Sequence, residues 1–539
     1  MRGVADPTTD SPSAGRQCIW LLVLTGVLLC LRLGATPLLG PDEPRYARVA
    51  VEMNRAHAWV LPTLGGRVWM EKPVLYYWLA KPALALFGET ELAVRLPSAL
   101  AGVVSVLFVF LVGCRLLGRR AGFYSALIMA TAVLAFVYSR AAAMDALLAA
   151  CVTGAIGLAA LRLFEDAGPW TLVGAYALAG LATLAKGPLG ILLPTLVFGT
   201  YWLTTRRKQD LTRLVSVGGL LAFAVVAVPW YALITAREGR DFLDVFILNH
   251  NIQRFTSTIH HHPGPVFYYL PILLAGLFPW TALLPLGLGR LQPAKNPRHR
   301  FLLVWLVAPL VFFSLAGSKL PGYIVPCVAP LALVTGAGAA SLTAADQRRS
   351  SRWLLPAGAA INLVVAALLV ALPFVLRAQG HSSWRLLLLP GAWAAGLGIL
   401  GLLWARRPRV VRLLALGAPG LLVLLALTTP RPLAEVASGK ALFEGIPPRD
   451  EILVLGASRS AWMAGYFYHE GRVREMPGGA TAVLEAAARQ PVLVLCGRSD
   501  CRRLAEPGYS VETLRFGPRH SRLVSVSRRR GTQVESPPS

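Results

Sequence analysis

Long apolar runs recur along most of this chain and constrain its fold more than any other feature. Each run of about 17 to 25 residues is long enough to cross the hydrocarbon core of a bilayer as a helix. Of the 539 residues, 55% are hydrophobic and only 15% are charged, which excludes an ordinary soluble protein. We therefore predict an α-helical polytopic membrane protein.

The apolar runs predict about thirteen membrane spans. Their approximate bounds are 17–35, 92–114, 121–138, 142–163, 170–185, 187–204, 213–235, 266–287, 301–316, 321–343, 353–376, 384–405 and 410–428. With a cytoplasmic N-terminus, the arginine-rich loops fall inside, as the positive-inside rule requires. An odd number of spans then puts the C-terminus outside.

The net charge of +26 does not indicate a nucleic-acid partner. Most basic residues lie in short loops between apolar runs, where positive charge sets topology and meets anionic membrane lipids. We therefore expect membrane lipids as partners and no nucleic acid.

Composition divides the chain into a membrane part and a small C-terminal domain. Alternating apolar segments at 451–456 and 491–497 predict strands, and 461–470 and 481–490 predict helices. The predicted organisation is a cytoplasmic N-terminal tail at 1–16, a membrane domain at 17–429 with long outside loops at 36–91 and 236–265, a soluble α/β domain outside the membrane at 430–525, and a disordered tail at 526–539.

Seven cysteines are present, five of them in or beside apolar runs. There a free thiol behaves as a small hydrophobic group. Cys496 and Cys501 are close enough in sequence to form a disulfide in an oxidising compartment, although geometry could forbid it. Both outcomes stay open at this point.

The segment from Pro41 to Lys81 follows the first apolar run but is rich in charged and aromatic residues. Asp42 can cap a short helix over residues 45–56, which we expect to lie flat at the membrane surface. The carboxylates of Asp42 and Glu43 would then face the region that this helix encloses. A second short helix is expected from Pro73 to Phe87.

Ionisable and polar side chains collect near the predicted outer face of the membrane. They are Asp42, Glu43, Arg45, Glu71, Lys72, Arg140, Asp145, Lys186, His250, Arg254, Lys319 and Tyr323. Such groups are costly at membrane depth and usually face a cavity or one another. Their collection on one side predicts a single polar chamber that opens outward.

Each of these residues also has a structural interpretation. Asp42 can be only a helix cap, and Asp145 can simply pair with Arg140. Residues 71–73 can form a solvated turn. Lys186 and Lys319, both in tight turns, can be membrane anchors. Two lysines so placed also suit an anionic ligand, which they would meet as point charges.

Six motifs in a fixed order give the chain a resemblance to a known family. They are PDEPRYA, EKPVLYYWLAK, SRAAAMDALL, AKGP, NHNIQRF and SKLPGYIVP. The chain resembles the GT-C lipid-linked glycosyltransferases, and most of all the bacterial aminoarabinose transferases that modify lipid A, relatives of the protein O-mannosyltransferases. The resemblance covers most of residues 17–430.

The resemblance implies roles for the residues in these motifs. Asp42 and Asp145 would be the catalytic carboxylates. The carrier phosphate would be bound by Arg45, Lys72, Lys186 and Tyr323, and we add Lys319 to the substrate-binding set because of its tight turn. Glu71 and His250 would hold a divalent metal, which is zinc in similar proteins. The chain departs from those proteins at Gly322.

The implied reaction is transfer of a pentose or hexose from a polyprenyl-phosphate donor to a periplasmic acceptor, most plausibly a lipid A type glycolipid. It would occur at the bacterial inner membrane by a single inverting displacement. Breaking the bond between the sugar and the phosphate leaves a negative charge that lysines and arginines can stabilise. A protein O-glycosyltransferase with the same donor class is the alternative enzyme, and a lipid or sugar transporter the alternative class. A transporter is expected to show repeats and a site near the membrane midplane.

Overall fold

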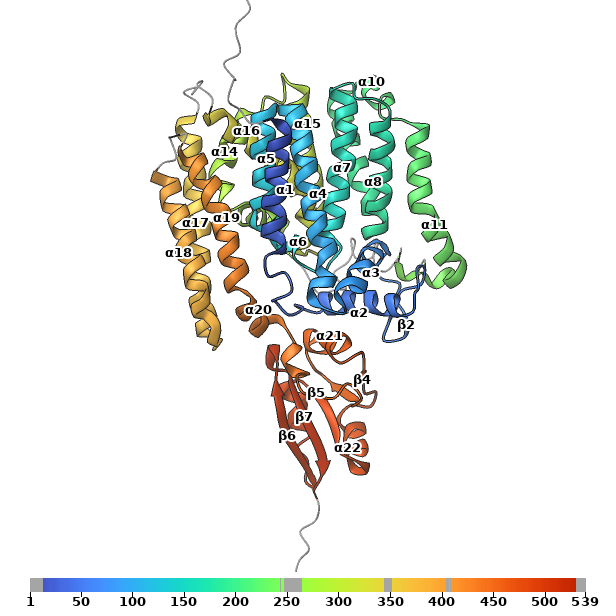
Figure 1. Ribbon diagram of the computed structural model, residues 1–539. Coiled ribbons are helices and arrows are strands. Elements are labelled where there is room, and N and C mark those ends of the chain that lie inside the picture. Colours follow the sequence, from blue (N-terminus) through green and yellow to red (C-terminus); the bar gives the residue numbers. More distant parts are fainter. Residues whose placement is uncertain are drawn as a thin grey trace, which may run out of the picture.

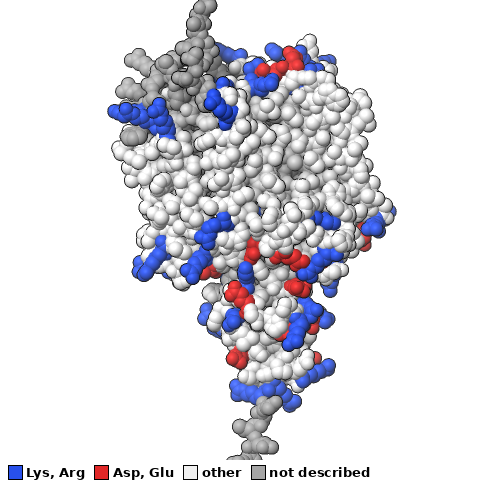
Figure 2. Space-filling model, in the orientation of Figure 1, with Lys and Arg blue, Asp and Glu red and all other residues white. Residues whose placement is uncertain are grey.

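A helical bundle joined to a small mixed sheet makes up the protein (Figure 1). The computed structural model describes residues 13–242, 244–246, 264–343, 351–403, 407 and 409–529. Figure 2 shows a broad band of uncharged surface across the visible face of the bundle, with charged side chains gathered above and below it. This pattern is the one expected for a bilayer core flanked by water and headgroups. The predicted fold class, a polytopic helical membrane protein with a C-terminal α/β domain, is confirmed.

Eight helical segments among the described residues are long and apolar enough to cross a membrane. They are α4 (Glu91–Leu117), α7 (Asp145–Phe164), α11 (Val217–Phe242), α15 (Pro297–Leu315), η4 with α16 (Pro321–Cys327 and Val328–Thr343), α17 (Ser351–Ala378), η5 with α18 (Ser382–Leu387 and Leu388–Leu403) and α19 (Arg409–Thr428).

Two further segments pass the same test only as bent pairs, which brings the number to ten. One is α5 (Arg119–Thr131) with α6 (Val133–Ser139), bent by 56°, and the other is η2–α13 (Val266–Tyr268 and Tyr269–Gly276) with η3–α14 (Trp280–Leu283 and Leu284–Arg290), bent by 105°. Pro279 lies at the second break, where its missing N–H interrupts helical hydrogen bonding.

Shorter helices occupy the remaining predicted spans: α1 (Ala14–Cys30), α8 (Trp170–Lys186) and α9 (Leu189–Thr205). Each of the thirteen predicted runs therefore coincides with a helix or a bent helix pair. The number of true crossings stays a prediction, because length and composition support eight to ten.

A layer of short elements lies between the bundle and the sheet domain (Figure 1). It contains α2 (Asp42–Arg55), α3 (Leu75–Phe87) and the hairpin of β1 (Thr63–Leu64) with β2 (Arg67–Val68). The hairpin was not predicted. The Glu52 carboxylate holds it, accepting hydrogen bonds from Thr63 Oγ1 and from the backbone N–H groups of Gly65 and Gly66.

Helix α2 lies across one end of the bundle (Figure 1), and its position at a membrane surface stays a prediction. Ten of its fourteen residues are buried, because α21 (Arg459–Tyr468) of the sheet domain packs against the side of α2 that faces away from the bundle. Pro41 occupies the N-cap position, and Asp42 is the first helical residue with its carboxylate turned to Arg45. The capping interpretation of Asp42 is therefore not the observed arrangement.

The C-terminal domain is a five-stranded sheet in the order β4-β3-β5-β7-β6. Strands β3 and β4 and strands β3 and β5 pair in parallel, whereas β7 pairs antiparallel with both β5 and β6. The strands are β3 (Ile452–Leu455), β4 (Val473–Glu475), β5 (Val492–Cys496), β6 (Tyr509–Phe516) and β7 (Arg522–Arg528), and the helices are α20 (Pro430–Ala437), α21, α22 (Gly479–Arg489) and α23 (Arg498–Arg503).

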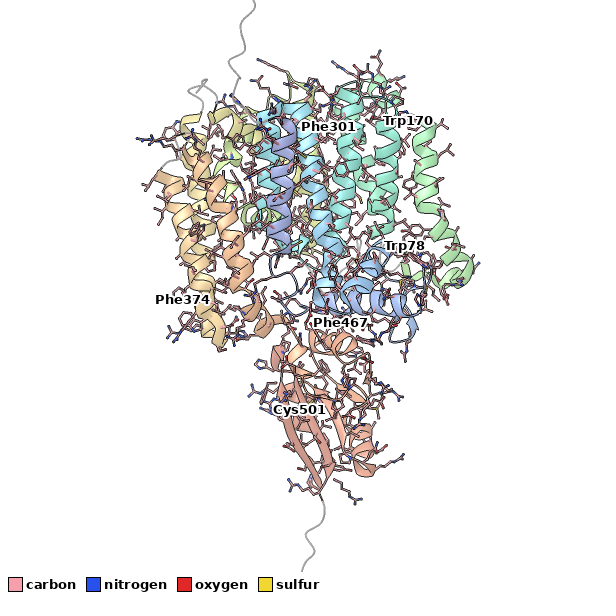
Figure 3. All side chains as sticks on the ribbon, in the orientation of Figure 1. Trp78, Trp170, Phe301, Phe374, Phe467 and Cys501 are labelled. Atoms are coloured by element: carbon pink, nitrogen blue, oxygen red, sulfur yellow. A yellow bond between two sulfur atoms is a disulfide. The ribbon has the colours of Figure 1, made fainter. Side chains whose placement is uncertain are left out.

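Two details of the predicted C-terminal domain are resolved by this sheet. Strand β7 runs to Arg528, three residues past the expected end of the domain, because Val526 is buried and pairs with Val492 and Val511. Cys496 at the end of β5 and Cys501 in α23 form a disulfide (Figure 3). Residues 530–539 of the expected disordered tail lie outside the described residues.

Candidate active site

Asp145 begins α7, and its carboxylate is bound by a lysine from the end of the neighbouring helix. Lys186 Nζ, at the last residue of α8, lies 2.5 Å from Asp145 Oδ1, and both side chains are largely buried. Helix dipoles favour a negative group at a helix start and a positive group at a helix end, so both backbones support these charges. Lys186 Nζ also lies 5.0 Å from the centre of the Tyr323 ring.

Arg140 has a different role from the pairing with Asp145 that was one interpretation of the sequence. Its Nη1 donates hydrogen bonds to the carbonyl oxygens of Leu28 and Leu29, at distances of 3.2 and 2.7 Å. These carbonyls belong to the last turn of α1, which has unsatisfied acceptors like every helix end. Arg140 therefore closes α1, and Lys186 is the cation that meets Asp145.

Arg45 forms the second charged centre, on α2. Its Nη2 lies 2.5 Å from Asp42 Oδ1, and its Nη1 lies 3.6 Å from Glu71 Oε2. The guanidinium is buried between the rings of Tyr46 and Trp69. Burial opposes the charge, but Tyr46, Asp42 and Glu71 together hold the pKa of this guanidinium above its ordinary value. The Asp42 side chain is 52% exposed and so remains open to a reactant.

Tyr46 is a buried phenol beside the second charged centre. Its hydroxyl lies 3.5 Å from Arg45 Nη2. Burial raises the pKa of this phenol, and the negative charges of Asp42 and Asp145 raise it further. The structure thus pairs Asp42 and Glu71 with Arg45, and it brings Lys186 to both Asp145 and Tyr323.

Glu43 faces away from the predicted polar chamber, contrary to the expectation that both carboxylates of the pair look into it. It is buried and forms an ion pair of 2.6 Å with Arg95 of α4. Its carboxylate also accepts hydrogen bonds from the backbone N–H groups of Leu39 and Ala142. Glu43 therefore fixes the start of α2 to the turn that precedes Asp145.

Arg95 was not singled out in the sequence, although it binds the chain segment that leads to Asp42. Besides Glu43, its guanidinium contacts the carbonyl oxygens of Leu33, Thr36 and Pro37. It lies inside a predicted span, close to its start, where a buried arginine is costly unless it is fully paired. That position was the signal that could have identified it.

Gly322 explains how Asp145 and η4 come so close together. A Cβ on this glycine would lie 2.6 Å from Asp145 Oδ1 and 2.9 Å from Tyr138 Cε1. Real Cβ contacts essentially never fall below 3.0 Å. The residue at which the chain departs from similar proteins is thus one that allows the Tyr323 segment to pack against the carboxylate.

The other predicted substrate-binding lysines are placed less directly. Lys319 is buried, and its Nζ donates a 2.7 Å hydrogen bond to the Ala316 carbonyl just past the end of α15. Lys72 follows Glu71 in a bend before α3 and is partly exposed. Their roles toward a substrate stay predictions.

One of the two predicted metal ligands, His250, cannot be placed. His250 lies outside the described residues, together with Arg254 and most of the loop around them. Within the part of the chain that the structure describes, no group of three or more His, Cys, Asp or Glu side chains could hold a metal ion. Glu71 faces Arg45 there. Zinc binding by Glu71 and His250 stays a prediction.

An apolar groove lies beside the charged region. It has a volume of about 640 Å³ and runs between α8 and α11, lined by residues such as Thr183, Phe223, Val228 and Tyr231. Thr183 precedes Lys186 by one helical turn, and its carbonyl accepts a hydrogen bond from the Tyr231 hydroxyl.

Comparisons with known proteins agree with this arrangement. The model of the dolichyl-phosphate-mannose-protein mannosyltransferase family matches residues 71–231. Two relatives carry the name undecaprenyl phosphate-alpha-4-amino-4-deoxy-L-arabinose arabinosyl transferase. The protein from Yersinia enterocolitica is 32% identical over 72% of this chain and 71% of its own length, and the protein from Aeromonas salmonicida is 35% identical over 66% of each chain. The matched segments thus span about two thirds of these relatives.

A solved structure shares the fold over nearly the whole chain. The crystal structure of ArnT from Cupriavidus metallidurans bound to undecaprenyl phosphate superimposes with a TM-score of 0.77 at 23% sequence identity. The match covers 95% of this chain and 98% of that protein. The bundle, the layer of short helices and the sheet domain therefore belong to one common architecture.

Proposed function

The chain belongs to the family of undecaprenyl phosphate-alpha-4-amino-4-deoxy-L-arabinose arabinosyl transferases, and from this premise we propose that it transfers a pentose, 4-amino-4-deoxy-L-arabinose. The donor is undecaprenyl phosphate carrying that sugar, and the acceptor is a lipid A type glycolipid. The observation that carries the proposal is the pair of carboxylate–cation contacts in the family's motifs, Asp42 with Arg45 and Asp145 with Lys186.

The reaction separates charge at the bond between the sugar and the phosphate. An acceptor oxygen forms a bond to the sugar C1 while the bond from C1 to the phosphate oxygen breaks, and undecaprenyl phosphate leaves with an added negative charge. Lys186, Arg45 and Lys72 stabilise that charge at a site partly removed from water, where such interactions are strong. This electrostatic stabilisation is the larger part of the catalysis.

The carboxylates act on the acceptor and on the reacting carbon. A phosphate on the acceptor is already ionised and needs no strong base, so Asp42 and Asp145 orient it or stabilise the positive charge that develops on the sugar carbon. With a hydroxyl acceptor, the half-exposed Asp42 takes the proton. In both cases one displacement inverts the configuration at C1.

The proposed orientation puts this site on the periplasmic side of a bacterial inner membrane. The disulfide between Cys496 and Cys501 suits an oxidising compartment. The sheet domain that carries it lies at the same end of the bundle as α2, whereas α1 begins at the opposite end (Figure 1). The N-terminus is then cytoplasmic, and the C-terminus is periplasmic.

Protein O-glycosylation is the second candidate, because the matching family model describes mannosyl transfer to protein. The two candidates differ only in their acceptor. Mass spectrometry of lipid A and of periplasmic proteins, from cells with and without this chain, distinguishes them. An aminopentose added to lipid A supports the proposal, and sugar found only on protein supports the alternative.

The site itself is tested by substitution of its carboxylates. In membranes supplied with the prenyl-phosphate sugar and lipid A, Asp42→Asn and Asp145→Asn should each lower transfer by at least about a hundredfold. Asp166→Asn is the matched control, because Asp166 is 77% exposed and pairs with Arg213 at the opposite end of the bundle. Undiminished transfer by both site variants, at normal protein levels, would refute the assignment.

A further inference from the structure

The backbone that leads into α2 is held at three consecutive N–H groups. The N–H of Leu38 donates to the Tyr468 hydroxyl over 2.7 Å, and that of Gly40 donates to the Ala437 carbonyl over 2.9 Å. The N–H of Leu39 donates to the Glu43 carboxylate over 2.7 Å. Two of these three acceptors lie in the C-terminal region, outside the membrane bundle.

The Tyr468 hydroxyl is fixed by a second bond. It donates to Glu91 Oε1 over 3.1 Å, and Glu91 in turn forms a 2.8 Å ion pair with Lys440. Through these hydrogen bonds the Tyr468 hydroxyl links α21 of the sheet domain to the first residue of α4 and to the backbone segment before α2. Phe467 beside it lies at the same junction (Figure 3).

The held segment is one that needs such fixation. Gly40 has a φ of +61°, a conformation that glycine adopts easily, and the backbone of a glycine loses more conformational entropy on ordering than that of any other residue. Asp42 follows only two residues later, and its carboxylate pairs with Arg45 of the same helix. The direction in which α2 begins, and with it the position of the Asp42 carboxylate, depends on this turn.

We propose that Tyr468 is a positioning residue, through which the C-terminal sheet domain holds the start of α2 and so places Asp42 for the reaction. The inference rests on the proposed function for its catalytic consequence. The sheet domain is then a working part of the transferase. Tyr468 itself stays away from the reacting atoms and acts through the backbone of Leu38.

The test is Tyr468→Phe in the full-length protein. The ring stays, and with it the contacts to Phe467 and to the Lys440 ammonium, so only the hydroxyl is lost. Tyr466→Phe is the matched control, because Tyr466 lies on the same helix and packs against Gly65 of the hairpin. It makes the same chemical change without touching the segment before α2.

Tyr468→Phe should lower kcat about fivefold to tenfold, the effect of one buried hydrogen bond, while the KM for the donor and the melting temperature stay near those of Tyr466→Phe. Hydrogen exchange should quicken in a peptide covering residues 36–42 of Tyr468→Phe alone. Glu91→Ala provides a second variant, because it removes the acceptor that orients the same hydroxyl. It should lower kcat in the same direction by a smaller factor.

Equal kcat values for Tyr468→Phe and Tyr466→Phe would overturn the inference. So would a loss of activity that only follows a loss of folded protein, because a purely structural role predicts that result. Absence of sugar transfer by the unaltered protein would instead remove the proposed function. Hydrogen exchange would then still decide whether Tyr468 holds the segment, and unchanged exchange in Tyr468→Phe would overturn that as well.

Discussion

Gly322→Ala tests whether the position of Asp145 controls the reaction. The added Cβ would lie 2.6 Å from Asp145 Oδ1 and 3.0 Å from Asp145 Cγ, whereas ordinary contacts begin at 3.4 Å. Relief of the contact with the oxygen requires a displacement of about 0.8 Å, the difference between 3.4 and 2.6 Å. Since η4 also packs against α15 and α16, we expect the Asp145 carboxylate to give way, together with the Tyr138 ring, whose Cε1 lies 2.9 Å from the same Cβ.

A displacement of this size is large for a catalytic group. Misplacement by about 1 Å can cost about a hundredfold in rate. We therefore expect kcat to fall about tenfold to a hundredfold, which corresponds to about 1.4 to 2.8 kcal/mol of transition-state stabilisation. The 2.5 Å contact with Lys186 should lengthen at the same time.

The assay is sugar transfer by purified protein in lipid nanodiscs, followed by mass spectrometry of the acceptor at saturating donor. Gly199→Ala is the control, because a Cβ there meets nothing within 4 Å. Gly199→Ala should keep the activity of the unaltered protein. If Gly322→Ala also does so while remaining folded, the contact between Gly322 and Asp145 does not limit catalysis and the reasoning fails.

Two further substitutions probe the surroundings of the site. Glu43→Gln leaves the buried Arg95 without a charged partner, so it should lower the free energy of unfolding by about 3 to 5 kcal/mol. The melting temperature measures this loss. The control is Glu89→Gln at the exposed pair with Arg55, which should cost less than about 1 kcal/mol. Equal shifts would contradict a structural role for Glu43. Lys72→Ala should raise the KM for the donor about tenfold with little change in the KM for the acceptor, and an equal rise in both would count against phosphate binding.

Much of the fold was predictable because the bilayer imposes a simple rule on the sequence. Runs long enough to span it must be helical, so every apolar run coincides with a helix or a bent pair. The outer-face residues were found by the same reasoning, since charge is costly at membrane depth. Asp145 and Lys186 stood out for that reason before any geometry was known.

The choice of partners was not predictable, because it depends on how distant elements pack. Asp145 and Lys186 are 41 residues apart and meet because α7 and α8 lie side by side. The nearer Arg140 is taken by the carbonyl groups that end α1. Similarly, the sequence of α2 is amphipathic, and only the docking of α21 on its other side buries it.

The sheet domain was predicted only in its buried strands. Strand β5 is apolar throughout and was recognised, whereas β6 lies at the edge of the sheet and carries Glu512 and Arg515 among mostly exposed positions. Edge strands often carry such charged residues, which weaken the alternation that marks a strand. Strand β7 was not predicted for a related reason, since its basic C-terminal end resembles the polar tail that follows it.

Under the proposed function, donor binding exchanges one anion for another at the ion pair of Asp145 and Lys186. Asp145 at a helix start and Lys186 at a helix end neutralise each other in a buried contact of 2.5 Å. Under the proposed function, a donor phosphate that reaches Lys186 competes with Asp145 for the same ammonium. The carboxylate is then released toward the sugar carbon, where positive charge develops as the phosphate leaves. On this proposal a single ion pair supplies both the cation for the leaving group and the anion for the reacting carbon, and Gly322 leaves the room beside Asp145 that the carboxylate needs to move.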